Sequence, residues 1–204
     1  MNENAFVIRV AQSTDLEDVA LIHHSSLPDG FLPQLGLDFL RKVYYPATVR
    51  STHAATLVAV LDGRVIGFVT IALDSPSFSR DILWRIITRL PFYVLRRILV
   101  QPSFLIKCWQ IFRATSLEKP FEIRSEIFYI AVEDIFRGRG LGKKLIYAAL
   151  NFLREKGVQE VWIKTLSENT TWISMFEGMG WQINKRFKLI DEEYVAIVGY
   201  IENR

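Results

Sequence analysis

Three glycines and four basic residues stand close together in the middle of the chain, and the pattern suits the binding of an anion. The glycines are Gly138, Gly140 and Gly142, and the basic residues are Arg137, Arg139, Lys143 and Lys144. Glycine has no Cβ, so the backbone can approach a ligand closely. The first N–H groups of a helix lack partners within the helix and carry the positive end of its dipole. The stretch therefore predicts a phosphate site, provided that a helix begins here.

The flanking residues predict the elements that position this loop. An almost unbroken apolar run from Ile127 to Val132 is typical of a buried strand. Apolar residues then recur at three- and four-residue spacing from Leu141 to Leu153, which predicts a helix with one buried face. Gly157 ends that helix after Lys156. The order is strand, glycine-rich turn, helix.

The spacing of the glycines narrows the choice of phosphate ligand. It gives G-x-G-x-G, whereas the dinucleotide fingerprint needs G-x-G-x-x-G, and the Walker pattern is absent. The motif R-x-x-G-x-G at Arg137, Gly140 and Gly142, preceded by Ile130 to Val132, resembles the coenzyme A pyrophosphate loop of the GNAT acetyltransferase superfamily. The alternative is a basic turn without a ligand, which three glycines disfavour because they cost stability.

The resemblance implies acetyl-CoA as cosubstrate and no metal. It implies that Ile130, Ala131 and Val132 offer backbone groups to the pantetheine arm. It implies a pyrophosphate contact for the loop residues Arg137, Gly138, Arg139, Gly140, Leu141, Gly142 and Lys143.

A later segment, E-N-T-T-W-I-S-M-F-E-G-M-G-W, resembles a second family helix in which Asn169 and Phe176 stand at cofactor-contacting positions. Asn169 is equally well suited to cap that helix. The family usually has tyrosine where Phe176 stands, as the acid that protonates the leaving thiolate. With phenylalanine the thiolate leaves unaided, Tyr129 or Tyr147 substitutes, or the protein is not catalytic.

Acetyl transfer to an amine needs an unprotonated nitrogen, and an alkylamine with a pKa near ~10.4 is mostly charged at neutral pH. A general base is therefore useful. Glu126 opens the strand E-I-F-Y-I-A-V, which resembles the family strand whose glutamate is that base. Strand alternation predicts that Glu126 shares a face with Phe128 and Ile130. The alternative is a glutamate in water, paired with Arg124.

Two adjacent histidines, His23 and His24, end the first predicted helix, beside the loop that lines the acceptor site in the resembling family. His24 could orient an acceptor. The more ordinary interpretation is a surface pair near a helix C-terminus. Two histidines without a third ligand do not predict zinc.

The order of predicted elements also resembles the GNAT fold. It predicts a mixed α/β fold: a twisted, mainly antiparallel sheet flanked by helices, in one domain over residues 1–204. The strands are expected at 6–10, 54–61, 64–73, 126–132, 160–166, 181–187 and 194–201, and the helices at 13–24, with Thr14 as cap, 37–49, 141–156 and 168–179. Residues 25–36 are expected to be loop.

Residues 75–121 form an insertion between the third and fourth predicted strands. Its helical spacing, broken by prolines, predicts two or three short helices over the acceptor side of the site. Arg80 to Arg113 holds seven basic residues and one acid, a net charge of +6. That charge suggests two roles: a lid that attracts an anionic acceptor, or a peripheral contact with an anionic membrane surface. The alternative is a helical subdomain that packs on its own core or on a second copy of the chain, as a homodimer.

Composition limits the functional classes. A net charge of +3 does not predict nucleic-acid binding, and the single cysteine agrees with a reducing compartment. No apolar run is long enough for a transmembrane segment, and Met1 to Val10 has no signal pattern, so a cytoplasmic location is expected. The sequence thus predicts an N-acetyltransferase that moves the acetyl group of acetyl-CoA to the primary amine of a small molecule, such as an amino sugar, or of a peptide. The alternative is a degenerate acetyl-CoA-binding sensor or scaffold.

Overall fold

The structure is a computed structural model that describes residues 6–115, 122–189 and 192–201. The end of the expected insertion, residues 116–121, and the ends of the expected single domain lie outside the described residues.

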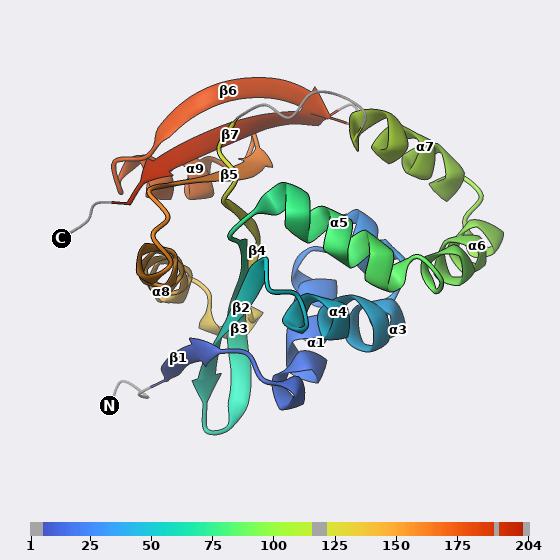
Figure 1. Cartoon of the computed structure of the whole chain (residues 1–204), viewed down its shortest axis with the longest axis horizontal. Coiled ribbons are helices and arrows are strands. Elements are labelled where there is room, and N and C mark those ends of the chain that lie inside the picture. The colour runs from blue at the N-terminus through green and yellow to red at the C-terminus, as the bar shows by residue number, and fades with distance from the viewer. Residues whose placement is uncertain (1–5, 116–121, 190–191, 202–204) are drawn as a thin grey trace.

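One sheet of seven strands runs through the molecule (Figure 1). The strands are β1 (Val7–Val10), β2 (Ala54–Leu61), β3 (Arg64–Ala72), β4 (Glu126–Val132), β5 (Glu160–Leu166), β6 (Gln182–Leu189) and β7 (Glu192–Tyr200). Their order across the sheet is β1-β2-β3-β4-β5-β7-β6. Within the described residues, β4 and β5 pair in parallel and the other neighbours pair antiparallel. The mixed α/β fold with a mainly antiparallel sheet is confirmed.

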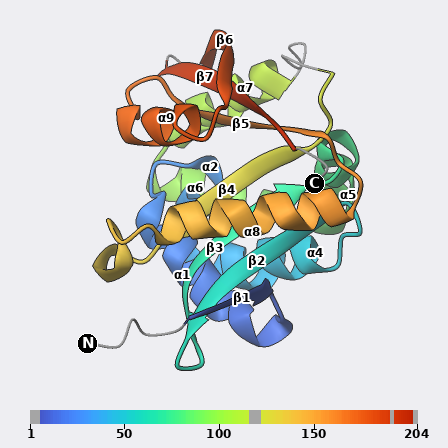
Figure 2. The same cartoon turned by 90° about the vertical axis from the view of Figure 1, so that its left-hand side faces the viewer.

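Helices cover both faces of the sheet. Helix α8 (Leu141–Glu155) crosses one face, and α9 (Thr170–Glu177) lies on the same side (Figure 2). The opposite face carries α1 (Leu16–Ser26) and the helical residues that lie between α1 and β2 in the chain. Strand alternation divides the core accordingly: Phe68 of β3 is buried with α1, and Val69 is buried with α8.

The first helix begins differently from the prediction that Thr14 caps it. Residues Ser13–Asp15 form a 3₁₀ turn, η1, and the carboxylate of Asp15 accepts a hydrogen bond from the Gln12 N–H at 2.7 Å. The same carboxylate pairs with Arg9 at 2.6 Å, and these partners hold the pKa of Asp15 below its usual value. The cap fails as a prediction because Asp15 lies opposite Arg9 of β1, a tertiary contact.

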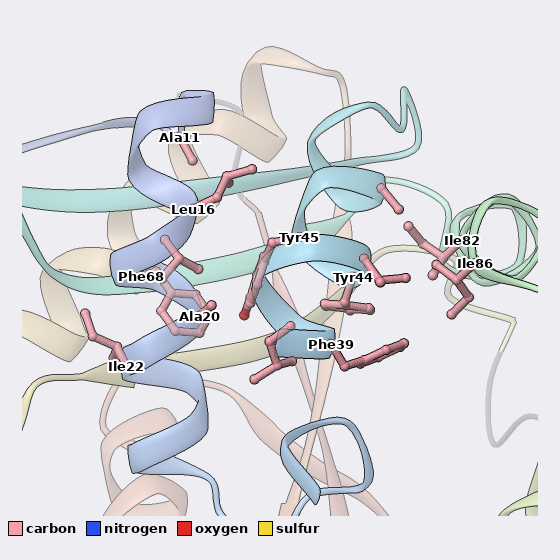
Figure 3. Close-up of a cluster of buried hydrophobic side chains, with 14 of the residues drawn as sticks. Ala11, Leu16, Ala20, Ile22, Phe39, Tyr44, Tyr45, Phe68, Ile82 and Ile86 are labelled. Carbon is pink, nitrogen blue, oxygen red and sulfur yellow. The ribbon is translucent and has the colours of Figure 1, made fainter. Parts of the chain in front are cut away.

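The second predicted helix contains a π-helical turn. Residues 37–49 form α3 (Leu37–Phe39), the π-turn η2 (Leu40–Tyr44) and α4 (Tyr45–Val49) without a gap. The extra residue of such a turn rotates the residues that follow it around the helix axis. Tyr44, the last residue of the π-turn, and Tyr45, the first residue of α4, are both buried (Figure 3). The predicted loop that precedes it contains a further short helix, α2 (Phe31–Gln34).

The insertion between β3 and β4 is helical, as the sequence predicts. It forms α5 (Ser75–Ile86), α6 (Leu90–Val100) and α7 (Phe104–Thr115). Pro76 and Pro91 stand in the first turns of α5 and α6, where the missing N–H costs no helical bond. Phe78, Ile82 and Ile86 bury the inner face of α5 against the core beneath α1.

Candidate functional site

The glycine loop leads directly into α8. Gly140 is the N-cap residue of α8, and its φ of 76° lies in the left-handed region that glycine alone adopts without strain. Gly138 has a φ of 73°. A Cβ at Gly138 or Gly140 would meet nothing within 4 Å, so both positions face open space. The first bond of the helix joins the Lys144 N–H to the Gly140 carbonyl at 3.1 Å. The N–H groups of Leu141 to Lys143 precede that bond and need other partners.

The basic residues of the loop differ in their surroundings. The guanidinium of Arg137 donates to the Val132 carbonyl at 3.0 Å and to Ser26 Oγ at 2.9 Å, and it pairs with Asp134. Arg137 therefore ties the loop to the end of β4 and to α1. The remaining cations lie over aromatic rings at 4.8–5.9 Å from the ring centres: Arg139 over Phe136, Lys143 over Tyr147 and Lys144 over Phe6.

The parallel pairing of β4 and β5 stops after two residue pairs. Glu126 lies opposite Trp162 and Ile127 opposite Ile163, and no further pair joins these two strands within the described residues. β4 nevertheless continues to Val132, where it stays paired with β3. Residues Ile130–Val132 are therefore not paired with β5 along the edge that faces away from β3. A gap between these strands puts main-chain groups within reach of a ligand chain.

The two expected contacts near α9 have partners inside the protein. Asn169 is the N-cap of α9, and its side chain accepts from the Trp172 N–H at 3.4 Å. Phe176 is fully buried, with its ring centre 5.8 Å from that of Trp172 and 4.7 Å from that of Trp181. The Phe176 ring therefore fills the core beneath α8 and does not face open space.

The expectation that Glu126 shares a face with both Phe128 and Ile130 is wrong. Thr70 of β3 lies opposite Tyr129, and the next residue, Ile71, lies opposite Ile127. Phe128 is thus the extra residue of a β-bulge, and a bulge breaks strand alternation. Phe128 and Tyr129 both pack on the α1 side, whereas Ile130 packs on the α8 side.

Glu126 is buried at the junction of the insertion and the sheet. Its residue exposure is 3%, so the alternative of a glutamate in water is wrong. Ser75, the first residue of α5, donates its hydroxyl to Glu126 Oε2 at 2.5 Å. Lys164 Nζ of β5 lies 3.7 Å from Glu126 Oε1. Arg124, the partner considered from the sequence, instead pairs with Asp74.

A cavity of about 950 Å³ lies between the insertion and the strands where β4 and β5 diverge. Glu126 is not part of its lining, but Lys164, which pairs with Glu126, is. Its lining includes Phe128 and Tyr129 of β4 and Lys164 of β5. Residues of α2, α5 and α7 also line it, among them Phe31, Leu32, Phe78, Ile82, Ile86 and Ile106. Tyr44 of η2 and Glu192 and Tyr194 of β7 belong to the lining as well. This volume matches the range of roughly 300–1,000 Å³ for small-molecule sites. Most of the lining surface is apolar, and the charged residues Asp29, Lys107, Lys164 and Glu192 also line the cavity.

The role of Lys164 was not predicted. A lysine inside the apolar strand E-V-W-I-K-T-L was the one signal for it in the sequence. Its side chain lines the cavity and also pairs with Glu126, so it links the buried carboxylate to the cavity.

His23 and His24 lie in different environments. His24 is exposed, and His23 is fully buried beneath the sheet. His23 Nδ1 lies 2.7 Å from the Tyr45 hydroxyl, and its ring centre is 4.5 Å from that of Tyr129. The interpretation as a surface pair is therefore wrong for His23. Burial lowers the pKa of His23 to about 3, so the ring is neutral at pH 7.

Tyr129 and Tyr147 were the two tyrosines considered in place of Phe176. Tyr129 lines the cavity, and burial together with the charge of Glu126 raises its pKa to about 12. It therefore keeps its proton at neutral pH and can donate a hydrogen bond. Tyr147 is 47% exposed on α8 beside Lys143.

Among the residues that the structure describes, no three metal-ligating side chains converge on one point. No helix there combines the length and apolar character needed to cross a bilayer.

Residues 22–181 match the acetyltransferase (GNAT) family. A 64-residue segment is 34% identical to N-alpha-acetyltransferase 30 of Saccharomyces cerevisiae and covers 31% of this chain and 36% of that protein. A 55-residue segment is 36% identical to mycothiol acetyltransferase of Nocardioides sp. and covers 27% and 19% of the two chains. The chain thus matches about a third or less of each relative's length.

Solved structures share the fold at low sequence identity. A structure described as an acetyltransferase superimposes with a TM-score of 0.67 and 18% identity, over 96% of this chain and 100% of that one. The ribosomal-protein-S18-alanine N-acetyltransferase of Escherichia coli gives 0.61 and 13%, over 98% and 96%. At these identities the likeness concerns the fold alone.

The burial of His23 predicts a dependence of stability on pH. Its pKa of about 3 in the folded chain lies below its ordinary value of 6.5, so below pH 6.5 the unfolded chain binds a proton that the native chain excludes. The contribution of neutral His23 to the free energy of unfolding is fully present above pH 6.5 and is lost as the pH falls towards 3. Between pH 7 and pH 5 the loss should be roughly 2 kcal/mol. Urea unfolding at both pH values should show this loss in the wild type and its absence in His23→Gln.

His24→Gln is the matched control, because His24 is the exposed neighbour. It should retain the full pH dependence. An unchanged pH dependence in His23→Gln would show that His23 is not the group responsible.

Proposed function

This chain belongs to the acetyltransferase (GNAT) family, and we propose that it transfers the acetyl group of acetyl-CoA to a primary amine. One observation carries the proposal: the left-handed glycine loop at the start of α8 lies beside a gap between β4 and β5, and a cavity lies at the end of that gap where the two strands diverge. The loop that would hold the phosphates is therefore close to the free edge of β4 and to the cavity that would hold the acceptor.

The residues present fit acetyl-CoA. The diphosphate would lie against the N–H groups of Leu141 to Lys143, where Gly138 and Gly140 leave open space. Arg139, Lys143 and Lys144 supply positive charge, and Arg137 holds the loop in place. The pantetheine arm would run along the free edge of Ile130–Val132. When bound, acetyl-CoA supplies an activated thioester.

We propose Glu126 as the general base of this site. It lies at the closed end of the gap, where β4 and β5 are still paired. Ser75 donates a hydrogen bond to Glu126 Oε2, and Lys164 Nζ lies at ion-pair distance from Oε1. Lys164 extends from that carboxylate into the cavity. A carboxylate in this position can take the proton of an ammonium acceptor, directly or through a water molecule.

The cavity supports an acceptor with an apolar body. Its wall includes the apolar residues Phe31, Leu32, Ile82 and Ile86. Burial of apolar surface against them favours the binding of an apolar ligand. Among the acceptors predicted from the sequence, the apolar wall favours a peptide terminus or an amine with a hydrophobic body over a highly polar amino sugar.

A second candidate function is an acetyl-CoA-binding module without turnover. The buried phenylalanine at position 176 favours it, because no hydroxyl is available there to protonate a thiolate. An ordinary thiol pKa near ~8.5 makes unaided departure of the thiolate tolerable, so catalysis remains the first proposal.

Replacement of Gly140 should weaken cosubstrate binding. In Gly140→Val the side chain would enter the open space of the loop, and it would also strain a residue whose φ is 76°. Gly157→Val is the matched control, because Gly157 has the same φ of 76° at the other end of α8. Calorimetry with acetyl-CoA should show at least a roughly tenfold loss of affinity for Gly140→Val, a loss of about 1.4 kcal/mol in binding. Equal affinity in both variants would remove the loop from the cosubstrate site.

Loss of the proposed base should slow turnover and spare binding. Glu126→Gln keeps the shape of the side chain and removes its basicity, so turnover of acetyl-CoA with an amine acceptor should fall roughly 10²- to 10⁴-fold. Affinity for acetyl-CoA should stay close to the wild-type value. Glu160→Gln, at the exposed start of the neighbouring strand β5, should retain full turnover. A fully active Glu126→Gln across the pH range would exclude Glu126 as the base.

Filling the cavity should weaken acceptor binding. Ser79 is an exposed residue of α5 that lines the cavity, so Ser79→Trp places a large ring in the acceptor space with little risk to folding. Steady-state kinetics should show an acceptor KM raised by roughly tenfold, with acetyl-CoA affinity unchanged. Ile87→Trp adds the same ring to a partly exposed position at the end of α5 that is not part of the lining. If both variants kept the wild-type KM, the cavity would not be the acceptor site.

A further inference from the structure

The helical arm formed by α5, α6 and α7 exposes an unusual amount of apolar surface. Of eighteen large exposed hydrophobic residues among those described, ten belong to the arm. These are Leu83, Trp84, Ile87, Phe92, Leu95, Leu99, Val100, Leu105, Ile106 and Trp109, with exposures between 43% and 75%. Helix α6 buries none of its residues. Single exposed hydrophobic residues are ordinary, but a cluster of this size on adjoining helices marks an interaction surface.

The position of the arm keeps this surface accessible. In Figure 1, α6 and α7 lie at the right-hand edge of the molecule, on the side away from α8. The arm is attached at its inner side, where Phe78, Ile82, Ile86 and Phe104 join the core. Leu83 and Ile106 line the cavity, and the other exposed residues belong to helices whose packed side is already occupied by the core.

The charge of the arm indicates the kind of partner. The side chains described from Ser75 to Trp109 include six basic residues: Arg80, Arg85, Arg89, Arg96, Arg97 and Lys107. The one acid among them, Asp81, pairs with Arg85 at 2.8 Å. Two copies joined face to face would bring these cationic surfaces together, and like charges in contact oppose association. The partner should therefore be anionic.

Among anionic partners, the exposed side chains favour lipid. A nucleic-acid surface needs polar and basic contacts, and it would leave Leu95, Leu99 and Val100 without apolar partners. Helices that lie in a membrane interface combine arginine or lysine with tryptophan, phenylalanine and leucine. Trp84 and Trp109 are of the aromatic type enriched at the level of lipid headgroups.

We propose that the outer side of the arm docks on an anionic lipid bilayer as a peripheral contact. The exposed leucines and aromatic rings enter the headgroup region, and the arginines contact the negatively charged headgroups. Leu83 and Ile106 are 50% and 60% exposed and also line the cavity, so docking brings the rim of the cavity to the lipid surface. The docking itself does not depend on the proposed acetyl transfer.

Co-sedimentation with lipid vesicles tests the proposal directly. The full chain should sediment with vesicles of phosphatidylcholine mixed with phosphatidylglycerol and should remain in solution with pure phosphatidylcholine. Raised salt should weaken the binding, because it screens the charges. Two double variants separate the contributions: Leu95→Ser with Leu99→Ser removes apolar contacts, and Arg80→Glu with Arg96→Glu reverses charge. Each should reduce the bound fraction at limiting lipid by at least about tenfold.

Matched controls come from other parts of the surface. Val7→Ser with Tyr200→Ser removes two side chains that are 61% and 67% exposed on β1 and β7. Lys185→Glu with Arg186→Glu reverses two exposed charges on β6. Both controls should bind the anionic vesicles like the wild type, and thermal unfolding of each variant checks that it is folded.

Three results would overturn the proposal. The first is a wild-type chain that stays in solution with the anionic vesicles. The second is binding that the arm variants and the control variants retain equally, or that is equal for the two lipid compositions. The third is a concentration-dependent dimer in light scattering that Leu95→Ser with Leu99→Ser dissociates, because the arm would then be covered by a second copy.

Discussion

The proposed site depends on one constraint, the early end of pairing between β4 and β5. Parallel strands need a crossover connection, and here the crossover is the glycine loop with α8. That connection places the start of α8 beside the end of β4. Because β5 leaves β4 after Ile127, the free edge of β4 and the start of α8 face the same gap. A sheet paired along its full length would have closed the gap with main-chain hydrogen bonds.

The closed end of the gap is held by contacts from three separate parts of the chain. Glu126 belongs to β4, Lys164 to β5 and Ser75 to the insertion. The Ser75 N–H also donates to the Arg124 carbonyl at 2.7 Å, and the Trp162 N–H donates to the Ser125 carbonyl at 3.1 Å. The insertion is thus joined to the strand that carries the proposed base. Its first helix cannot shift far without disturbing Glu126.

Local patterns in the sequence predicted the elements and the loop. The glycine spacing, the apolar strand and the amphipathic helix each arise from residues close together in the chain, so the order of elements and the helical insertion could be predicted. The features that were wrong or missed arise from distant contacts. The bulge at Phe128 depends on the register with β3, and the burial of His23 depends on Tyr45 and Tyr129 around it. Lys164 lies thirty-eight residues beyond Glu126, and the sequence holds no local sign of their pairing.

The arm and α8 lie on opposite sides of the sheet, and this arrangement has a consequence for access (Figures 1 and 2). The cationic residues of the glycine loop flank the start of α8, whereas those of the arm flank an apolar surface on the far side. A phosphate-bearing cosubstrate and an apolar acceptor would therefore approach the gap between β4 and β5 from different directions. The cations of the loop can then bind the cosubstrate while those of the arm contact a different partner, because occupation of one side leaves the other side accessible.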